Sequence, residues 1–191
     1  MNKVFGRKEC FVPLREDASR WIVSYDYTEE TDGENATWYE VYFYKKTDGK
    51  PGIERIRDAI IADIDARTDE RILSGYEWTV LHGDEDGSHI GETVNVWLTM
   101  ENQNNFKEAH RIAGNNASLV IPVKFKISED AEKYAIYETF NSFEELNAFY
   151  LGAFAYVKAC LDAGWQKKDA FDRTPYEEAL GNSDIQSVSE V

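Results

Sequence analysis

The chain has 191 residues, a net charge of −15, and enough hydrophobic (42%) and aromatic (14%) residues for a folded protein. This length suffices for one sizeable domain, or for a domain with an appendage, without a disulfide or a metal. The excess of 36 acidic over 21 basic side chains argues against nucleic acid and anionic membranes as partners. Because there is neither an 18-residue apolar run nor an apolar core near the N-terminus, the sequence predicts no membrane span and no signal peptide.

Two segments near the N-terminus predict an antiparallel hairpin. Residues 20–26 and 37–46 are rich in β-branched and aromatic residues, and the polar loop between them contains an Asp-Gly turn pair. Aromatic residues fall on both faces of the second strand, so we expect that strand to be covered on both sides or to contain a bulge. The Gly- and Pro-containing stretch 46–52 predicts a joint, which makes residues 1–50 an N-terminal β-hairpin region.

The middle of the chain predicts a helix, a second hairpin and another helix. Isoleucines at three- and four-residue spacing place one apolar face on a helix over about residues 53–67. Residues 76–81 and 93–99 predict two strands joined by a connection too long for a tight turn. Thr99 can cap the helix that follows, because its hydroxyl can accept a hydrogen bond from the first helical turn.

The C-terminal part predicts one more strand pair and a long helix. Residues 119–127 and 134–140 are the strands, the first at a sheet edge or a bulge because of its proline. Ser142 and Glu145 form a capping box, which predicts a helix start, and Gly164 is expected to end that helix. The apolar stripe of this helix consists of Phe143, Leu146, Tyr150, Ala153, Val157 and Leu161.

These elements define the expected fold. Residues 51–180 are predicted to form an α+β domain that ends in a short helix at about 175–180, and residues 181–191 a flexible tail. The fold class is α+β, with an antiparallel, hairpin-built sheet and two to three helices packed on it.

The loop at residues 82–89 is the best metal candidate in the sequence, because Asp84 and Asp86 alternate between two histidines. It lacks the bidentate glutamate of an EF-hand loop and the closely spaced His/Cys pairs of zinc sites. We therefore expect a solvated loop, with no metal and no cofactor. Cys10 and Cys160 adjoin apolar residues and predict buried reduced thiols, with a disulfide between them as the alternative.

Residue chemistry does not predict an enzyme. No serine or cysteine lies in a recognisable nucleophile motif. Glu138, Glu144 and Glu145 could in principle form an acid/base pair for glycoside hydrolysis, but among 36 acidic residues such neighbours are expected by chance. His110 lies on or beside an apolar helical face, which is more typical of a packed histidine than of a catalytic base.

A small-ligand or carbohydrate-binding module is one class of function that the residues allow. Trp78 and Trp97 could stack on sugar rings, and Gln103 lies in an amide-rich run that could hydrogen-bond a ligand. Packing in the core or on a sheet is the alternative for both tryptophans.

One set of features carries a family resemblance that covers residues 53–168. These features mark helix ends, strands and turns rather than catalytic motifs. They are Ile64-Asp65, Ile72 with Gly75, Trp97, Glu101 with Gln103-Asn104, Pro122, and the helix end Trp165-Gln166-Lys167-Lys168. In this order they resemble an uncharacterised domain family found in phage and prophage tail proteins, including those of gut Bacteroidales.

The resemblance implies a non-enzymatic, phage- or prophage-derived structural or tail-associated protein, either cytoplasmic or virion-associated. Such a protein acts through contacts with a protein partner or by self-association. The aromatic hairpin at 20–46 is then the expected docking edge, because exposed strands pair with partner strands and aromatic anchors dominate interfaces. Its candidate contact residues are Trp38, Tyr39, Tyr42 and Tyr44, with packing on the protein's own core as the alternative.

Overall fold

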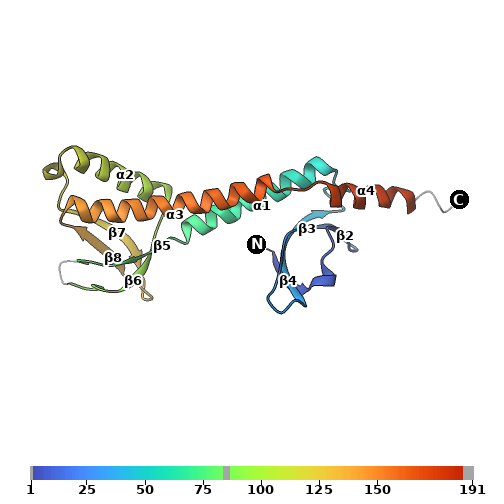
Figure 1. Cartoon of the computed structure of the whole chain (residues 1–191), viewed down its shortest axis with the longest axis horizontal. Helices are drawn as coiled ribbons and strands as arrows, with labels where there is room; N and C mark the ends of the chain where they lie inside the picture. Colours follow the sequence, from blue (N-terminus) through green and yellow to red (C-terminus); the bar gives the residue numbers. More distant parts are fainter. Residues whose placement is uncertain (1, 84–86, 187–191) are drawn as a thin grey trace. The chain divides into compact units, whose positions relative to one another are not determined.

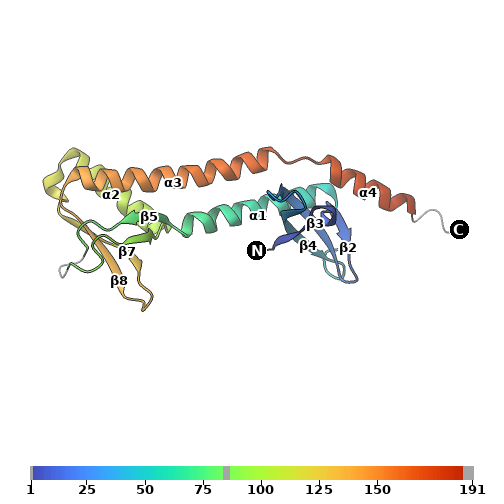
Figure 2. The ribbon, with the colours of Figure 1, turned by 60° about the horizontal axis from the view of Figure 1, so that its bottom comes forward.

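The computed structural model describes residues 2–83 and 87–186, and Figures 1 and 2 label most of its helices and strands. The chain forms two compact units. Unit 1 comprises Met1–Arg67 and Gly164–Val191, and unit 2 comprises Thr68–Ala163. The fold class is α+β, as the sequence predicts, because helices pack on antiparallel sheets built from hairpins.

Unit 1 contains a four-stranded antiparallel sheet in the order β1-β4-β3-β2. Its centre is the predicted hairpin, with β3 at Arg20–Glu29 and β4 at Asn35–Tyr44. The sequence did not predict the two outer strands, β1 at Lys3–Arg7 and β2 at Leu14–Glu16, which are too short to show a period-two pattern. Strand β4 is therefore paired with β3 along one edge and with β1 over Asn35–Tyr39 on the other.

The bulge lies in β3 rather than in β4, where the aromatic pattern suggested it. The register shifts between Tyr25 and Thr28, and Asp26 between them has a positive φ of 55°. Its carboxylate accepts a hydrogen bond from Arg67 at 3.2 Å. Arg67 also bonds to Asp63 at 3.1 Å and to the Tyr25 hydroxyl at 3.1 Å, so the bulge is held to α1 (Ile53–Leu73) by a partly buried charge network.

The core of unit 1 lies between the sheet and the isoleucine face of α1. Ile56, Ile60 and Ile64 are each at most 3% exposed, which confirms the predicted apolar face. The helix runs past the predicted end at Arg67, because Thr and Asp cost a helix only a few tenths of a kcal/mol each. It ends at Gly75, which has a φ of +82° and donates its N–H to the Ile72 carbonyl.

Helix α4 (Thr174–Gln186) completes unit 1, and it is longer than the predicted helix at 175–180. The buried Tyr176 belongs to the same hydrophobic cluster as the isoleucine face, and its hydroxyl donates to the Ser24 carbonyl at 3.0 Å. Residues 181–186, which we expected to belong to a flexible tail, are helical, and 187–191 lie outside the described residues.

Unit 2 contains two further hairpins and two helices. Strands β5 (Tyr76–Thr79) and β6 (Thr93–Val96) pair with each other, as do β7 (Val123–Glu129) and β8 (Ala135–Phe140). The Trp97 N–H donates to the Ile127 carbonyl at 2.8 Å, which links the end of β6 to β7.

The helices of unit 2 begin where the sequence predicts. Helix α2 (Met100–Asn115) is capped by the Thr99 side chain, and α3 (Phe143–Asp169) follows the Ser142 cap. Two expectations were wrong. Strand β7 starts at Val123 rather than at residue 119, since 117–119 form a 3-10 turn. Helix α3 continues through Gly164, because a buried interior glycine costs only about 1 kcal/mol.

The buried face of α3 differs from the predicted stripe. Leu146, Phe149, Ala153 and Cys160 are at most 6% exposed and pack with Phe106, Phe140 and Trp78 in one hydrophobic cluster. Tyr150 and Val157, which we expected in the core, are only half-buried. Cys160 is buried as expected, whereas Cys10 is exposed, and both thiols are free. Within the described ranges, no helix combines the length and apolarity needed to cross a bilayer.

Candidate functional site

Helices α2 and α3 lie alongside each other in unit 2 (Figures 1 and 2). Each contributes residues at positions i, i+3, i+4 and i+7, a spacing that brings side chains to one face of a helix. These residues of the two helices, together with Phe106, line a hollow of about 270 Å³, here called the α2–α3 groove. Its other lining residues are Met100, Gln103, Asn104 and Lys107 from α2, and Tyr150, Ala153, Phe154 and Val157 from α3.

The floor and the α3 wall of this groove are apolar. Phe106 and Ala153 are buried, and Phe106 packs edge-to-face against Phe125 and Phe149, with ring centroids 5.0 and 4.9 Å away. Aromatic packing of this kind keeps the floor rigid. At the rim, Phe154 is 56% exposed and Met100 is 70% exposed, so large apolar side chains face solvent beside a well-packed core.

The α2 wall of the groove is polar. Gln103 donates its side-chain amide to the Leu98 carbonyl at 2.7 Å, which fixes it at the start of the helix. Asn104 and Lys107 are exposed, and their side chains form no hydrogen bond or ion pair with the described residues. The groove therefore has one apolar wall and one polar wall. On the polar wall, the amide of Asn104 and the ammonium group of Lys107 are available to hydrogen-bond a ligand.

A second, more open hollow of about 480 Å³ adjoins the groove, and Lys107 and Tyr150 line both. Its histidine, His110, stacks on Tyr150 with ring centroids 4.2 Å apart and forms a hydrogen bond between Nε2 and Asn147 Oδ1 at 2.8 Å. This is the packed histidine that the sequence indicated. The remaining lining residues are Arg111, Gly114 and Asn115.

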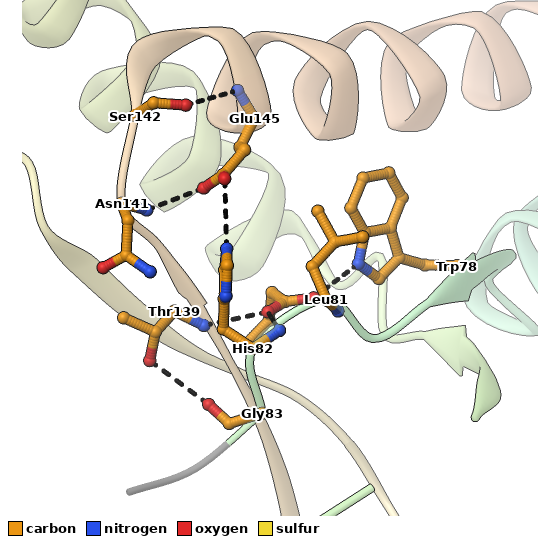
Figure 3. Close-up of polar contacts among 9 residues, drawn as sticks. Trp78, Leu81, His82, Gly83, Thr139, Asn141, Ser142 and Glu145 are labelled. Carbon is orange, nitrogen blue, oxygen red and sulfur yellow. Dashed lines mark hydrogen bonds and ion pairs between the residues drawn. The ribbon is translucent and has the colours of Figure 1, made fainter. Parts of the chain in front are cut away.

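Apart from the two hollows, unit 2 contains a cluster of polar groups around Glu138 on β8. The Glu138 side chain is fully buried. Its carboxylate accepts N–H hydrogen bonds from the Trp78 indole at 2.8 Å and from the backbones of Leu81, His82 and Thr139 at 2.7, 3.0 and 3.1 Å (Figure 3). Four donors compensate the cost of burying this charge. The arrangement anchors the segment after β5 to β8.

A neighbouring contact connects the same segment to α3. His82 Nε2 lies 3.0 Å from Glu145 Oε1, and Glu145 Oε2 accepts the Asn141 N–H at 2.8 Å (Figure 3). The Glu145 N–H donates to Ser142 Oγ at 3.2 Å, so the predicted capping box is present. The hydrogen bond from His82, followed by that from Asn141, lowers the pKa of the Glu145 carboxyl.

The structure does not bring the predicted sugar-binding residues together. Only Gln103 lines the α2–α3 groove. Trp78 is bound to Glu138 and packs on Phe149, with ring centroids 5.1 Å apart, while the Trp97 ring lies 5.0 Å from Lys126 Nζ.

The predicted docking residues of β4 each contact a different neighbouring side chain within unit 1. Trp38 is 3% exposed and donates its indole N–H to Glu40 at 3.1 Å. The guanidinium of Arg67 lies 3.6 Å from the centre of the Tyr39 ring, and that of Arg20 lies 4.1 Å from the Tyr42 ring. Tyr44 alone of the four is exposed. Strand β3 pairs along β4, whereas β1 pairs only with its first half, Asn35–Tyr39. Docking at this hairpin therefore stays a prediction, with Tyr44 as its exposed residue.

The predicted metal loop lies partly outside the described residues, because 84–86 are not among them. Its two histidines contact different carboxylates: His82 contacts Glu145, and His89 Nδ1 lies 2.9 Å from Glu92 Oε2. Over residues 2–83 and 87–186, no three His, Cys, Asp or Glu side chains are grouped so that they could hold a metal ion.

Sequence reasoning missed Lys107 and Phe154, and it placed Tyr150 in the core. A signal for the α2 side was available, since Met100, Gln103, Asn104 and Lys107 have helical spacing within the amide-rich run. Nothing comparable marked the α3 side, because apolar residues surround much of that helix and periodicity alone did not select the solvent-facing stripe.

The fold and the groove define a class: an α+β protein with an open hollow between two helices. More specifically, residues 55–186 match the family described as Domain of unknown function (DUF4376), and the chain belongs to that family. This match includes the whole of the groove and confirms the expected uncharacterised domain. No curated protein matches the chain, and no solved structure does.

Proposed function

We propose that this protein is a non-enzymatic, tail-associated structural protein of phage or prophage origin, and that it works through protein–protein contacts made at the α2–α3 groove. The observation that carries the docking role is the exposure of Phe154 and Met100 beside a rigid, buried floor. Exposed apolar groups gathered around a hollow are typical of protein interaction sites. The tail association rests on the sequence resemblance.

The surroundings of the hairpin residues favour this groove over the aromatic hairpin. Of the four hairpin candidates, Trp38, Tyr39 and Tyr42 are engaged within unit 1 and only Tyr44 faces solvent. Deleting residues 1–50 would not isolate a docking role, because it removes strands that cover the isoleucine face of α1.

Selection of peptide binders on the full chain tests the docking role. A displayed library of random 16-residue peptides is selected on the wild-type chain, and each binder is then measured on Phe154→Asp by fluorescence anisotropy. We expect binding to weaken at least about tenfold, because a carboxylate on the apolar wall must be desolvated by the peptide. Circular dichroism checks that the variant is folded.

The matched control is Leu119→Asp, which places the same charge at another exposed apolar residue of unit 2, one that lines neither hollow. Binders should keep their affinity for this variant. The proposal fails if no peptide is enriched, or if the binders tolerate Phe154→Asp as well as Leu119→Asp. Light scattering on the purified chain then separates self-association, seen as a multiple of 22.0 kDa, from docking on another protein.

The alternative function is a small-ligand or carbohydrate-binding module. Sugar sites use aromatic rings as platforms, and the two candidate tryptophans do not line the groove, which leaves Tyr150 and Gln103 for that role. Titration of glycans against tryptophan fluorescence tests this alternative. Saturable quenching that is lost in Gln103→Ala would favour it over protein docking.

A further inference from the structure

The charges along the two hollows have one sign, although the chain as a whole is acidic. Among the described residues, the charged side chains that line them are Lys107 and Arg111, and no aspartate or glutamate is among the lining residues. The chain has 36 acidic and 21 basic side chains, so a lining without carboxylates departs from the average surface. Docking surfaces are commonly complementary in charge to their partners.

The two basic residues differ in whether a carboxylate of the chain binds them. Arg111 forms a two-fold hydrogen bond with Glu108 on the same helix, at 2.9 and 2.6 Å, so its charge is largely compensated. Lys107 lacks an ion pair with the described residues. The Glu108 carboxylate, which already binds Arg111, also attracts the Lys107 ammonium group, so Lys107 carries the less compensated of the two charges.

Lys107 and Tyr150 line both hollows and so mark the place where the two meet. The Tyr150 ring is held by the stack on His110, whereas its hydroxyl has no hydrogen-bond partner among the described residues. An ammonium group and a phenol hydroxyl are both donors, and a carboxylate accepts from both.

We propose that the occupant of the groove is an acidic amphipathic helix of a partner protein, a proposal that rests on the docking function proposed above. Its apolar residues, at i, i+3, i+4 and i+7, pack on Phe106, Phe154 and Val157. Its flanking carboxylate binds Lys107 and Tyr150 where the hollows meet. Helix-in-groove recognition uses this spacing of anchors, and the apolar α3 wall opposite the polar α2 wall matches the two faces of such a helix.

The test uses a helical peptide library with leucines fixed at i, i+3, i+4 and i+7, and with each flanking position randomised between Glu and Lys. It is selected on the full chain in parallel with Lys107→Glu and with Lys46→Glu. The last variant makes the same charge change at an exposed lysine of unit 1, outside the groove. Since the altered lysines are exposed, both variants should fold.

On the wild-type chain and on Lys46→Glu, the selected peptides should be enriched in Glu at the position beside the leucines. On Lys107→Glu the preference should reverse to Lys. A selected Glu peptide should bind Tyr150→Phe at least about tenfold more weakly than wild type, as expected for one lost hydrogen bond to a charged group, and its affinity should fall with added salt.

Selection without a charge preference, or with a preference that Lys107→Glu leaves unchanged, would overturn the acidic partner. If such peptides still lose binding to Phe154→Asp, the docking groove itself stands and only the partner's chemistry is wrong. If neither this library nor the random library yields binders sensitive to Phe154→Asp, the proposed function fails as well.

Discussion

At the scale of single residues, two charged side chains of unit 2 differ in burial and in hydrogen bonding. Glu138 is buried, and four N–H groups satisfy its carboxylate. Lys107 is exposed and unpaired within the described chain. A buried charge that is fully hydrogen-bonded maintains structure, and removing part of its bonding is costly. An exposed charge stays hydrated and so remains accessible to a partner.

Glu138→Gln should destabilise the protein by about 2–4 kcal/mol, because the new amide group presents N–H to donors that previously met a carboxylate oxygen. The shift of the urea midpoint, with far-UV circular dichroism as the probe, measures the change. Glu132→Gln makes the same substitution at an exposed position and should alter the midpoint by less than about 0.5 kcal/mol. Equal effects of the two variants would contradict the anchoring role of Glu138.

At the scale of elements, helix starts were easier to predict than helix ends. Thr99 and Ser142 were identified because a cap depends on one side chain close to the backbone that it satisfies. The ends of α1 and α3 were predicted too early, at Arg67 and Gly164, since an unfavourable residue inside a helix costs less than tertiary packing can supply. At Gly75, just after α1, the fold adds a second requirement for glycine, because a Cβ there would clash with Val96 of β6.

Gly75→Ala should destabilise the protein more than Gly33→Ala, by about 2 kcal/mol or more. Both glycines have positive φ, +82° and +69°, so both substitutions strain the backbone. Only at Gly75 would the added Cβ clash, 2.1 Å from the Val96 carbonyl oxygen, whereas at Gly33 nothing lies within 4 Å. Thermal denaturation of the two variants gives the comparison. Similar melting temperatures would show that the clash relaxes at little cost.

At the scale of the whole molecule, the net charge of −15 opposes the folded state through repulsion between like charges, which salt screens. Many of the ion pairs join exposed side chains and contribute little. Partly buried networks, such as the one around Arg67, are less sensitive to salt. Screening should therefore relieve more repulsion than attraction.

Raising sodium chloride from about 20 mM to about 500 mM should raise the melting temperature by about 2–5 °C, since the Debye length falls from roughly 20 Å to roughly 4 Å. Differential scanning calorimetry measures this shift. Glu132→Lys changes the net charge from −15 to −13 at an exposed position and should reduce the salt effect. A melting temperature that falls with salt would mean that local ion pairs outweigh the overall repulsion.

The sequence by itself determined the α+β class, the three principal hairpins, the isoleucine face of α1 and the caps of α2 and α3. These features depend on periodicity and on single side chains near their own backbone, which a linear pattern records. Tertiary structure alone decided that β1 and β2 flank the first hairpin and that Glu138 collects four donors. It also decided that α2 and α3 together form a groove with one unpaired lysine. These features require contacts between residues that are distant in sequence. The role of a given aromatic residue, carboxylate or lysine depends on those neighbours, which the linear sequence does not identify.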